Sequence, residues 1–273
     1  MRKKSCPVSL RSVVIQIRGT TEEMKLQHAV VLLTLLLAVA CNKKEAEPTV
    51  KIESSMGPSV QIDQSTVGSI TGTVKLTGSV PPAQTIDMSQ DAACKGANTA
   101  ETYIVDNGNL ANAVVYVKDG LANYAYPSLS DTATVDQDGC KYLPHVLAVR
   151  TNQPVKFLNS DPTSHNVHPT PDKNEEWNES QQPKADPITR QFSQPELMMP
   201  VKCNQHPWMK MYLSVFNHPY FAVTGKDGKF ELKGLPPGTY TVAVVHEKLG
   251  EKTQQVTIGP KESKSTDFIY ASQ

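Results

Sequence analysis

The chain has 273 residues, and its 27 basic and 27 acidic side chains give a formal net charge of zero. No net field therefore singles out nucleic acid as a partner, and we expect no nucleic-acid binding. The 20 prolines, the 15 glycines and many short runs of Val, Thr and Tyr favour β-strands with frequent turns, whereas long amphipathic helical patterns are missing.

The N-terminal residues have the pattern of a secretion signal. Residues 29–40 form an apolar run of twelve, broken by a single threonine, which is too short to span a bilayer and has the length of a signal-peptide core. Small residues then lead into Cys41, and this ending resembles a bacterial lipoprotein signal. We expect residues 1–40 to be the signal peptide, with translation starting at Met1 or at Met24, and Cys41 to carry the lipid.

The residues around and after Cys41 predict where in the cell the protein is located. Residues 41–67 are polar and poor in aromatic side chains, which is typical of a flexible tether. A lipid on Cys41 would hold the protein in an oxidising compartment outside the inner membrane, in the periplasm or at the cell surface. Asn42, rather than an acidic residue, follows the lipid site, which favours the outer membrane over the inner membrane.

Beyond the tether, short strand-like runs alternate with turn signals, and we expect an all-β protein. The expected strands are residues 69–76, 101–105, 112–118, 145–150, 154–159, 201–203 and 211–216. Residues 220–270 continue as a meander of strands and of turns that contain Gly or Pro. Residues 169–195 are polar and poor in strand-forming residues, so we expect a surface excursion there.

One short segment brings three metal-binding side chains together. Cys203, His206 and Met209 have the spacing Cys-x2-His-x2-Met. Thiolate, imidazole and thioether donors suit copper, and a trigonal His2Cys plane with a weak axial Met is the arrangement of a blue-copper site. The second histidine must come from elsewhere, and the expected strand at 154–159 leads towards His165.

The order of these motifs resembles the ligand pattern of the cupredoxins. A strand that ends in Phe-x-Asn is followed by His-Asn-Val and then by Cys-x2-His-Pro-x-Met, over residues 134–216. The spacing is most similar to the amicyanin branch, with the plastocyanin branch next. The resemblance implies a Greek-key β-sandwich that holds one type 1 copper ion, with the ligands His165, Cys203, His206 and Met209.

The resemblance also assigns roles to residues around the ligands. Asn166 matches the asparagine that ties the two ligand loops together, and its expected partner is the backbone around Asn204. His206 is implied to expose a ring edge through an apolar patch where a redox protein docks, such as a cytochrome or a dehydrogenase. The expected patch consists of Pro207 and Trp208, together with Met198, Met199 and Pro200 unless the two methionines are core residues.

Alternatives remain open for the ligand set. His168 can replace His165, and Met211, five residues after His206, can replace Met209, although Met211 looks like the start of a strand. A structural zinc site, or a packed core with a free thiol, competes with a copper site. Zinc, however, prefers four N, S or O donors and rarely uses Met.

Two cysteines remain once the lipid site and the thiolate ligand are assigned. Cys94 and Cys140 both lie in turn-rich contexts, and in an oxidising compartment we expect a disulfide between them. A second metal site or a redox-active pair is the alternative. The histidines outside the motif have no metal-site spacing and are expected to be structural or on the surface: His145, His218 and His246.

The C-terminal residues resemble a second family. Within residues 224–244 an Asp-Gly-x-Phe turn leads to Leu-Pro-Pro-Gly-x-Tyr, which is similar to the carboxypeptidase-regulatory-like β-sandwich, and segments within 70–117 are similar to its opening strands. We expect a cupredoxin-like copper domain at 68–217 and a regulatory-like sandwich segment at 218–273. That segment is either appended or interleaved with strands from 69–118. The combination resembles lipoproteins labelled as methylamine-utilisation proteins.

Two functions follow from these features. The first is electron transfer, in which a membrane-anchored type 1 copper protein carries single electrons between periplasmic partners. The second is a cell-surface β-sandwich that binds glycan or protein, with copper as a structural ion or as cargo. The sequence has no Gly-rich phosphate loop, no Ser nucleophile elbow and no His-Glu-x-x-His motif, so we do not expect an enzyme.

Overall fold

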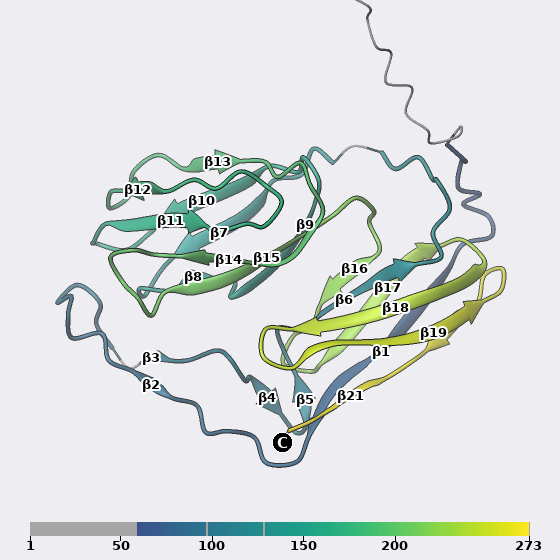
Figure 1. The fold of residues 1–273 in the computed structure, drawn as a ribbon, viewed down its shortest axis with the longest axis horizontal. Coiled ribbons are helices and arrows are strands. Elements are labelled where there is room, and N and C mark those ends of the chain that lie inside the picture. Colours follow the sequence, from purple (N-terminus) through teal and green to yellow (C-terminus); the bar gives the residue numbers. More distant parts are fainter. Residues whose placement is uncertain (1–58, 97, 128, 273) are drawn as a thin grey trace, which may run out of the picture. The chain divides into compact units, whose positions relative to one another are not determined.

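The computed structural model describes residues 59–272, except 97 and 128 (Figure 1). Strands, turns and loops make up this part of the chain, and it holds no helix long and apolar enough to cross a membrane. The predicted all-β class is therefore confirmed for the described residues. The expected signal peptide at 1–40, the lipid site at Cys41 and the tether up to residue 58 lie outside the described residues.

Twenty-one strands are present in the described residues, and most of them are short. They are β1 (Gly68–Thr77), β2 (Thr85–Ile86), β3 (Asn98–Thr99), β4 (Val105–Asp106), β5 (Asn109–Leu110), β6 (Val114–Asp119), β7 (Ala133–Gln137), β8 (Tyr142–Leu143), β9 (Val146–Arg150), β10 (Val155–Asn159), β11 (His165–Pro169), β12 (Glu179–Gln181), β13 (Ile188–Arg190), β14 (Glu196–Lys202), β15 (Lys210–Phe216), β16 (Phe221–Val223), β17 (Lys229–Leu235), β18 (Gly238–His246), β19 (Gly250–Ile258), β20 (Ser263–Ser265) and β21 (Phe268–Ala271).

Two sheets built from the beginning and the end of the described chain form a β-sandwich that we term the terminal sandwich (β1, β4 to β6 and β16 to β21). One sheet has the order β17-β1-β5-β4, with β20 and β21 also paired to β1, and the other has the order β16-β6-β18-β19. In the parallel pair of β1 and β21, Val74 is paired with Phe268. Strands within residues 68–119 therefore share sheets with strands within residues 221–271.

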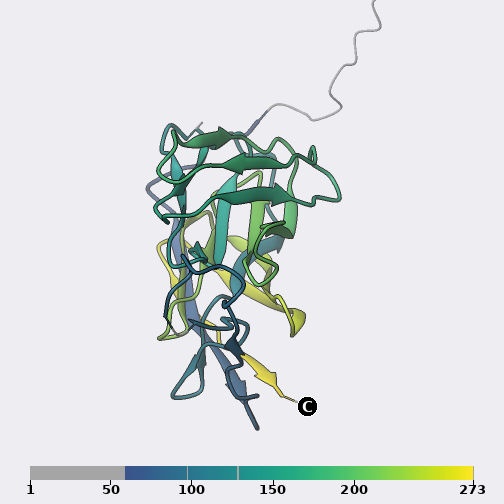
Figure 2. The ribbon, with the colours of Figure 1, turned by 90° about the vertical axis from the view of Figure 1, so that its left-hand side faces the viewer.

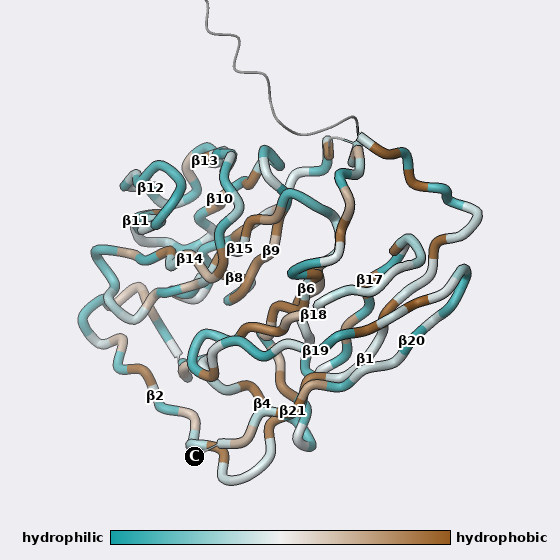
Figure 3. Tube along the Cα trace, turned by 45° about the vertical axis from the view of Figure 1, so that its right-hand side comes forward, coloured by the Kyte–Doolittle hydropathy of each residue, from teal (hydrophilic) through white to brown (hydrophobic). Residues whose placement is uncertain are grey.

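The core of the terminal sandwich follows from alternation of apolar and polar side chains. In β18, Tyr240, Val242 and Val244 are buried, whereas Thr239 is exposed, as expected for a strand with one face turned to a core. These side chains pack in one cluster with apolar residues of β1, such as Ile70. Figure 3 shows hydrophobic residues along β6 and β18, whereas the edge strand β19 is mostly polar and exposed.

The residues between these segments form a second β-sandwich, which we term the central sandwich (β7 to β15). A sheet with the order β13-β10-β7-β8 packs on a sheet with the order β12-β11-β14-β15-β9 (Figures 1 and 2). In β10, Val155, Phe157 and Asn159 are buried and alternate with half-buried side chains. Phe157 shares its core with Val201 of β14 and Leu213 of β15.

A smaller apolar cluster contains strands from both sandwiches. Val114 and Tyr116 of β6 pack with Val146 of β9, Phe216 of β15 and Ala243 of β18. The rings of Tyr116 and Phe216 have centroids 5.1 Å apart. β15 begins directly after the metal-ligand motif, and its last residue, Phe216, packs against the terminal sandwich.

A loop outside both sandwiches reaches the metal-ligand region. β2 and β3 pair as a short antiparallel hairpin, and we term its connecting residues 87–96 the β2–β3 loop. Cys94 in this loop forms a disulfide with Cys140 in the turn between β7 and β8, so the predicted pairing is confirmed. The disulfide fastens the β2–β3 loop to the central sandwich.

Two of the strand predictions are wrong in detail. Residues 169–195, expected as an excursion poor in strands, contain β12 and β13. Both are three-residue, largely polar strands at the edges of their sheets, where an apolar pattern is not required. Of the strand expected at 101–105, only Val105 lies in a strand, namely β4.

Candidate metal centre

The loop between β14 and β15 holds three of the four expected ligands. The backbone N–H of Cys203 donates to the carbonyl of Met209 at 3.2 Å, and the N–H of Met209 donates to the carbonyl of His206 at 2.9 Å. These two hydrogen bonds close the loop on itself. Cys203, His206 and Met209 are all buried within it.

The fourth expected ligand, His165, is the first residue of β11 and is fully buried. The loop before it is shaped by Asn159, the last residue of β10. The side-chain amide of Asn159 donates to the carbonyl of Thr163 at 2.9 Å and to that of Gln181 at 3.0 Å. The Asn of the Phe-x-Asn motif thus positions His165 without being a ligand.

The structure brings His165, Cys203 and His206 together. Nδ1 of His165 lies 2.8 Å from Nδ1 of His206, and Sγ of Cys203 lies 3.7 Å from Nδ1 of His206. The three ligand atoms lie within 4.8 Å of one another, and all three side chains are buried. Two imidazole nitrogens and one thiolate sulfur therefore point to one small volume inside the central sandwich.

The cysteine sulfur is held as the metal-binding form. The backbone N–H of Asn166 donates to Sγ of Cys203 at 3.2 Å. Burial raises the pKa of Cys203, but hydrogen bonds from His165 and from backbone amides, including that of Asn166, outweigh burial and lower the pKa to about 6. The thiolate is the form of cysteine that binds metals.

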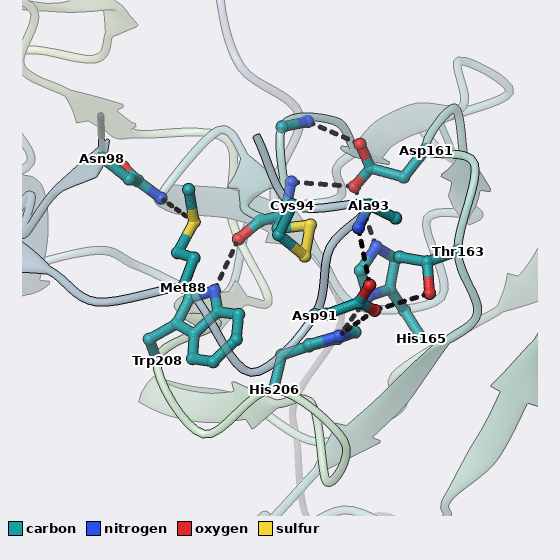
Figure 4. The surroundings of a disulfide bond; sticks show 12 residues. Met88, Asp91, Ala93, Cys94, Asn98, Asp161, Thr163, His165, His206 and Trp208 are labelled. Atoms are coloured by element: carbon teal, nitrogen blue, oxygen red, sulfur yellow. Dashed lines mark hydrogen bonds and ion pairs between the residues drawn. A yellow bond between two sulfur atoms is a disulfide. The ribbon is translucent and has the colours of Figure 1, made fainter. Parts of the chain in front are cut away.

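Aspartate carboxylates accept hydrogen bonds from the outer nitrogens of both rings (Figure 4). Oδ2 of Asp161 lies 2.8 Å from Nε2 of His165, and Oδ2 of Asp91 lies 3.0 Å from Nε2 of His206. A carboxylate that accepts from Nε2 fixes the ring orientation and leaves the Nδ1 lone pair of the neutral ring for a metal.

Each aspartate is itself fixed by further hydrogen bonds. Asp161 accepts from the backbone N–H of Gly139 and from that of Cys140, both at 2.8 Å. Asp91 accepts from the hydroxyl of Thr163 and from the backbone N–H of Ala93, both at 2.8 Å. The N–H of Ala93, then the hydroxyl of Thr163 and His206, lower the pKa of Asp91 to about 2.

The charge of His165 follows from these contacts. Burial lowers its pKa, but the carboxylate of Asp161 and the sulfur of Cys203 outweigh burial and raise the pKa to about 9. Burial likewise raises the pKa of Asp161, and its hydrogen bonds lower the pKa below the ordinary value. Without a metal ion His165 is thus protonated at neutral pH, and metal binding must displace that proton.

No family model and no curated protein matches this chain, whereas solved structures that include the following three are similar to part of it. The copper-containing nitrite reductase from Thermus scotoductus SA-01 has 21% identity and a TM-score of 0.31, over 37% of this chain and 26% of its own. A mutant of amicyanin in the Cu(I) state has 22% identity and a TM-score of 0.27, over 31% and 81%. A purple cupredoxin from Nitrosopumilus maritimus has 18% identity and a TM-score of 0.27, over 30% and 98%.

These likenesses are local. The chain spans about a quarter of the length of the nitrite reductase that it matches. Because every TM-score is below 0.5, none of the three likenesses is evidence for the function of this chain. The evidence comes from its own side chains.

The donor set fits a copper ion. Two imidazole nitrogens and a thiolate form the trigonal set that copper takes in blue-copper sites, and a thioether lies in the same loop. A structural zinc site needs four N, S or O donors. Within the described residues, the cluster of His165, Cys203 and His206 offers three.

The methionine alternatives occupy different positions. Met211 lies in β15 opposite Val201 of β14, and its side chain, like that of Met209, is buried in the core of the central sandwich. Met209 lies in the ligand loop, which its backbone closes. This position favours Met209 over Met211 as the axial donor.

The alternative histidine lies outside the cluster. Nδ1 of His168 is 2.9 Å from Oδ1 of Asn204, and its Nε2 is 2.8 Å from Oε1 of Glu176. Asn166 and Asn204 also differ from expectation, because the side-chain amide of Asn166 donates to Asn178 at 3.1 Å and not to the backbone around Asn204. The two ligand segments are instead linked by the bond from Asn166 N–H to the sulfur of Cys203 and by the bond from the Ser164 hydroxyl to the side chain of Gln205.

The expected exposure of the His206 ring edge is wrong for this structure. His206 is 4% exposed, because its outer nitrogen is bonded to Asp91 of the β2–β3 loop. Of the expected patch, Pro207 is exposed, and Trp208 is half-buried with its Nε1–H donating to the carbonyl of Cys140 at 3.2 Å. Met199 belongs to the core of the central sandwich, whereas Met198 and Pro200 are half-buried.

The other histidines take no part in the metal clusters of the described residues. Nε2 of His145 lies 2.7 Å from a carboxylate oxygen of Glu247. His218 and His246 are buried, and burial lowers the pKa of each to about 4. Both are therefore neutral at physiological pH, as expected for structural histidines.

Sequence reasoning missed the two aspartates. Asp161 carries a weak signal, since it lies four residues before His165, directly after the strand that leads into the ligand loop. Asp91 carries none, since 115 residues separate it from His206.

Proposed function

We propose that this protein is a type 1 copper protein that carries single electrons between redox partners. The observation that carries the proposal is the buried group of His165 Nδ1, His206 Nδ1 and Cys203 Sγ, with Met209 in the same loop. The proposal further places the protein in the periplasm or at the cell surface, on a lipid at Cys41.

Copper, when bound there, supplies a one-electron couple, and the residues of this chain hold its surroundings. Asp161 and Asp91 keep the two rings from rotating through their bonds to Nε2. The N–H of Asn166 holds the sulfur of Cys203, and burial excludes water from all three ligands. Donors held in this way would leave little reorganisation to accompany the transfer of an electron.

The docking surface proposed for the redox partner is the pair Pro207 and Trp208. Pro207 is exposed, and the half-buried ring of Trp208 has its centroid 5.1 Å from that of His206. The outer edge of His206 itself is occupied by Asp91. An electron therefore leaves past Trp208 towards a partner such as a cytochrome or a dehydrogenase.

The proposal extends to the arrangement of domains. The terminal sandwich is taken as a carboxypeptidase-regulatory-like sandwich, and the copper-binding central sandwich as an insertion in it. The support is the pairing of β1 with β17 and β21, together with separate apolar cores for the two sandwiches. A second candidate function follows from this separate core: binding of glycan or protein by the terminal sandwich, with copper as cargo.

The test is an optical and EPR spectrum of the copper-loaded protein, followed by voltammetry. We expect intense absorption near the red end of the visible, a Cu(II) EPR signal and a reversible one-electron couple. Cys203→Ser removes the absorption, whereas Lys202→Ala, an exposed neighbour, leaves it unchanged. A copper-loaded wild-type protein without this absorption would overturn the proposal.

A further experiment separates the two candidate functions. If the terminal sandwich is a binding module, Cys203→Ser removes the absorption and leaves glycan or protein binding intact. Binding that disappears together with the absorption rules that second function out.

A further inference from the structure

The disulfide lies directly beside the candidate metal centre. Sγ of Cys94, a carboxylate oxygen of Asp91 and a ring nitrogen of His206 lie within 4.8 Å of one another. Sγ of Cys140 forms an equally close group with Asp161 and His165. Figure 4 draws the disulfide together with the rings of His165 and His206 and with Asp91 and Asp161.

The two cysteines of the disulfide differ in exposure. Cys94 is 7% exposed, whereas Cys140 is fully buried. Cys94 lines a hollow in the surface together with residues 85–89 and Gly96. Met88, a third sulfur-containing residue, lines the same hollow. Of the two cysteines, Cys94 is therefore the one that lies nearer to the surface.

We propose that the Cys94–Cys140 disulfide is reducible, and that the two thiolates then bind one Cu(I) ion beside the first metal centre. Thiolate and thioether donors select Cu(I) over harder ions. The site differs from the first one in its ligands, because Cys203 is the one free cysteine of the described residues and already belongs to the first cluster. The proposal goes beyond electron transfer and does not depend on it.

The reduction balances with an external dithiol as the reductant. A thiolate of that dithiol attacks Sγ of Cys94, the S–S bond breaks, and Cys140 leaves as a thiolate that takes up a proton. The second thiol of the reductant then displaces Cys94 from the mixed disulfide, so the reductant becomes a disulfide and the pair has gained two electrons. When Cu(I) binds to the two sulfurs, their protons pass to solvent.

The two short strands that carry the loop allow the sulfurs to separate. β2 and β3 have two residues each, and the loop is attached to the central sandwich by the disulfide and by the bonds of Asp91 to Thr163 and His206. Reduction removes the covalent attachment and leaves the bonds of Asp91. The loop then stays near the centre while Cys94 moves away from Cys140 to admit an ion.

The test uses the mature Cys203→Ser chain, in which the first centre lacks its sulfur. The chain is prepared oxidised and after reduction by a dithiol that is then removed, and each sample is titrated anaerobically with Cu(I) held by a competing chelator. A triple variant with Cys94→Ser, Cys140→Ser and Cys203→Ser measures what the histidines bind by themselves. Circular dichroism records the β-sheet signal throughout.

We expect the reduced chain to bind one more Cu(I) per chain than either the oxidised chain or the triple variant. Two more thiols than in the triple variant should react with a thiol reagent before the titration and none of these two afterwards, and X-ray absorption at the copper edge should show two sulfur neighbours. Equal binding in all three samples overturns the proposal, and so does loss of the β-sheet signal on reduction. Because every sample lacks the Cys203 sulfur, neither outcome bears on the type 1 proposal, which the wild-type spectrum tests.

Discussion

Replacing Asp161 by Asn tests whether the carboxylates behind the ligand rings hold the metal centre in place. The carboxylate of Asp161 accepts from Nε2 of His165, from the N–H of Cys140 and from the N–H of Gly139, each at 2.8 Å. An asparagine side chain has one acceptor oxygen and one NH2 group. In either orientation of the amide, the NH2 group faces at least one of these donors.

The magnitude follows from the donor that is left without an acceptor. If the amide oxygen stays on His165 and Cys140, the N–H of Gly139 loses its partner, at a cost of about 1 to 3 kcal/mol in the stability of the folded state. The bond to His165 becomes one to a neutral acceptor, so the ring is held less firmly. Loss of such a partner typically lowers metal affinity about 10- to 100-fold, or about 1 to 3 kcal/mol.

Copper affinity is measured by competition with a chelator, and the free energy of unfolding by urea denaturation of the metal-free protein. Asp138→Asn is the matched control, because Asp138 is an exposed aspartate in the turn that carries Gly139 and Cys140, and the hydrogen bond from His165 Nε2 goes to Asp161. We expect an unchanged affinity for the control and the stated decrease for Asp161→Asn. An Asp161→Asn protein with wild-type copper affinity would refute the reasoning.

Three further predictions concern single side chains. Burial lowers the pKa of His246 to about 4, so below pH 6.5, the ordinary pKa of histidine, the unfolded chain takes up a proton at this residue and the folded chain does not. The free energy of unfolding therefore falls as the pH falls. In urea denaturation, His246→Phe should reduce the loss of stability between pH 7 and pH 5 by about 2 kcal/mol. Met211→Leu should cost less than about 1.5 kcal/mol and leave the copper spectrum unchanged, whereas Met209→Leu should alter it; the opposite result would make Met211 the axial ligand. Trp208→Phe, which loses the bond to the carbonyl of Cys140, should lower the thermal stability by about 1 kcal/mol, and no change would mean that this bond contributes nothing.

The ligands were the most predictable part of the site. Cys203, His206 and Met209 lie within seven residues, so their joint position depends on one loop and is visible in the sequence. His165 could be added because it follows a strand with a recognisable ending. The structure brings His165, Cys203 and His206 together, and the methionine prediction still needs the substitutions above.

The residues that support the ligands could not be predicted, because their positions depend on tertiary packing. Asp91 reaches His206 across 115 residues, because the disulfide of Cys94 and the packing of Met88 hold the β2–β3 loop against the central sandwich. The disulfide was predicted from the number of cysteines and the compartment, which say nothing of what it lies against. The expected exposure of His206 was wrong because it, too, depends on a tertiary contact, namely the bond from His206 to Asp91.

The fold class was predictable and the strand partners were not. Alternating side chains in residues 239–244 mark a strand with one buried face, and such patterns sufficed for an all-β prediction. Which strand pairs with which depends on long-range contacts that periodicity does not contain. Short strands such as β12 were missed because three mostly polar residues at a sheet edge carry no pattern.

The pairing of β1 has a consequence for the order in which the chain can fold. β1 lies between β17 and the later strands β20 and β21, and the N–H of Thr73 donates to Asp267, 194 residues further along. During synthesis, the apolar side chains of β1, such as Ile70 and Val74, therefore stay exposed until almost the whole chain has been made. The central sandwich can close earlier, since β7 pairs with β10 and β14 with β15 over short separations. The copper ligands can therefore be assembled while the terminal sandwich is still open and dependent on protection from aggregation.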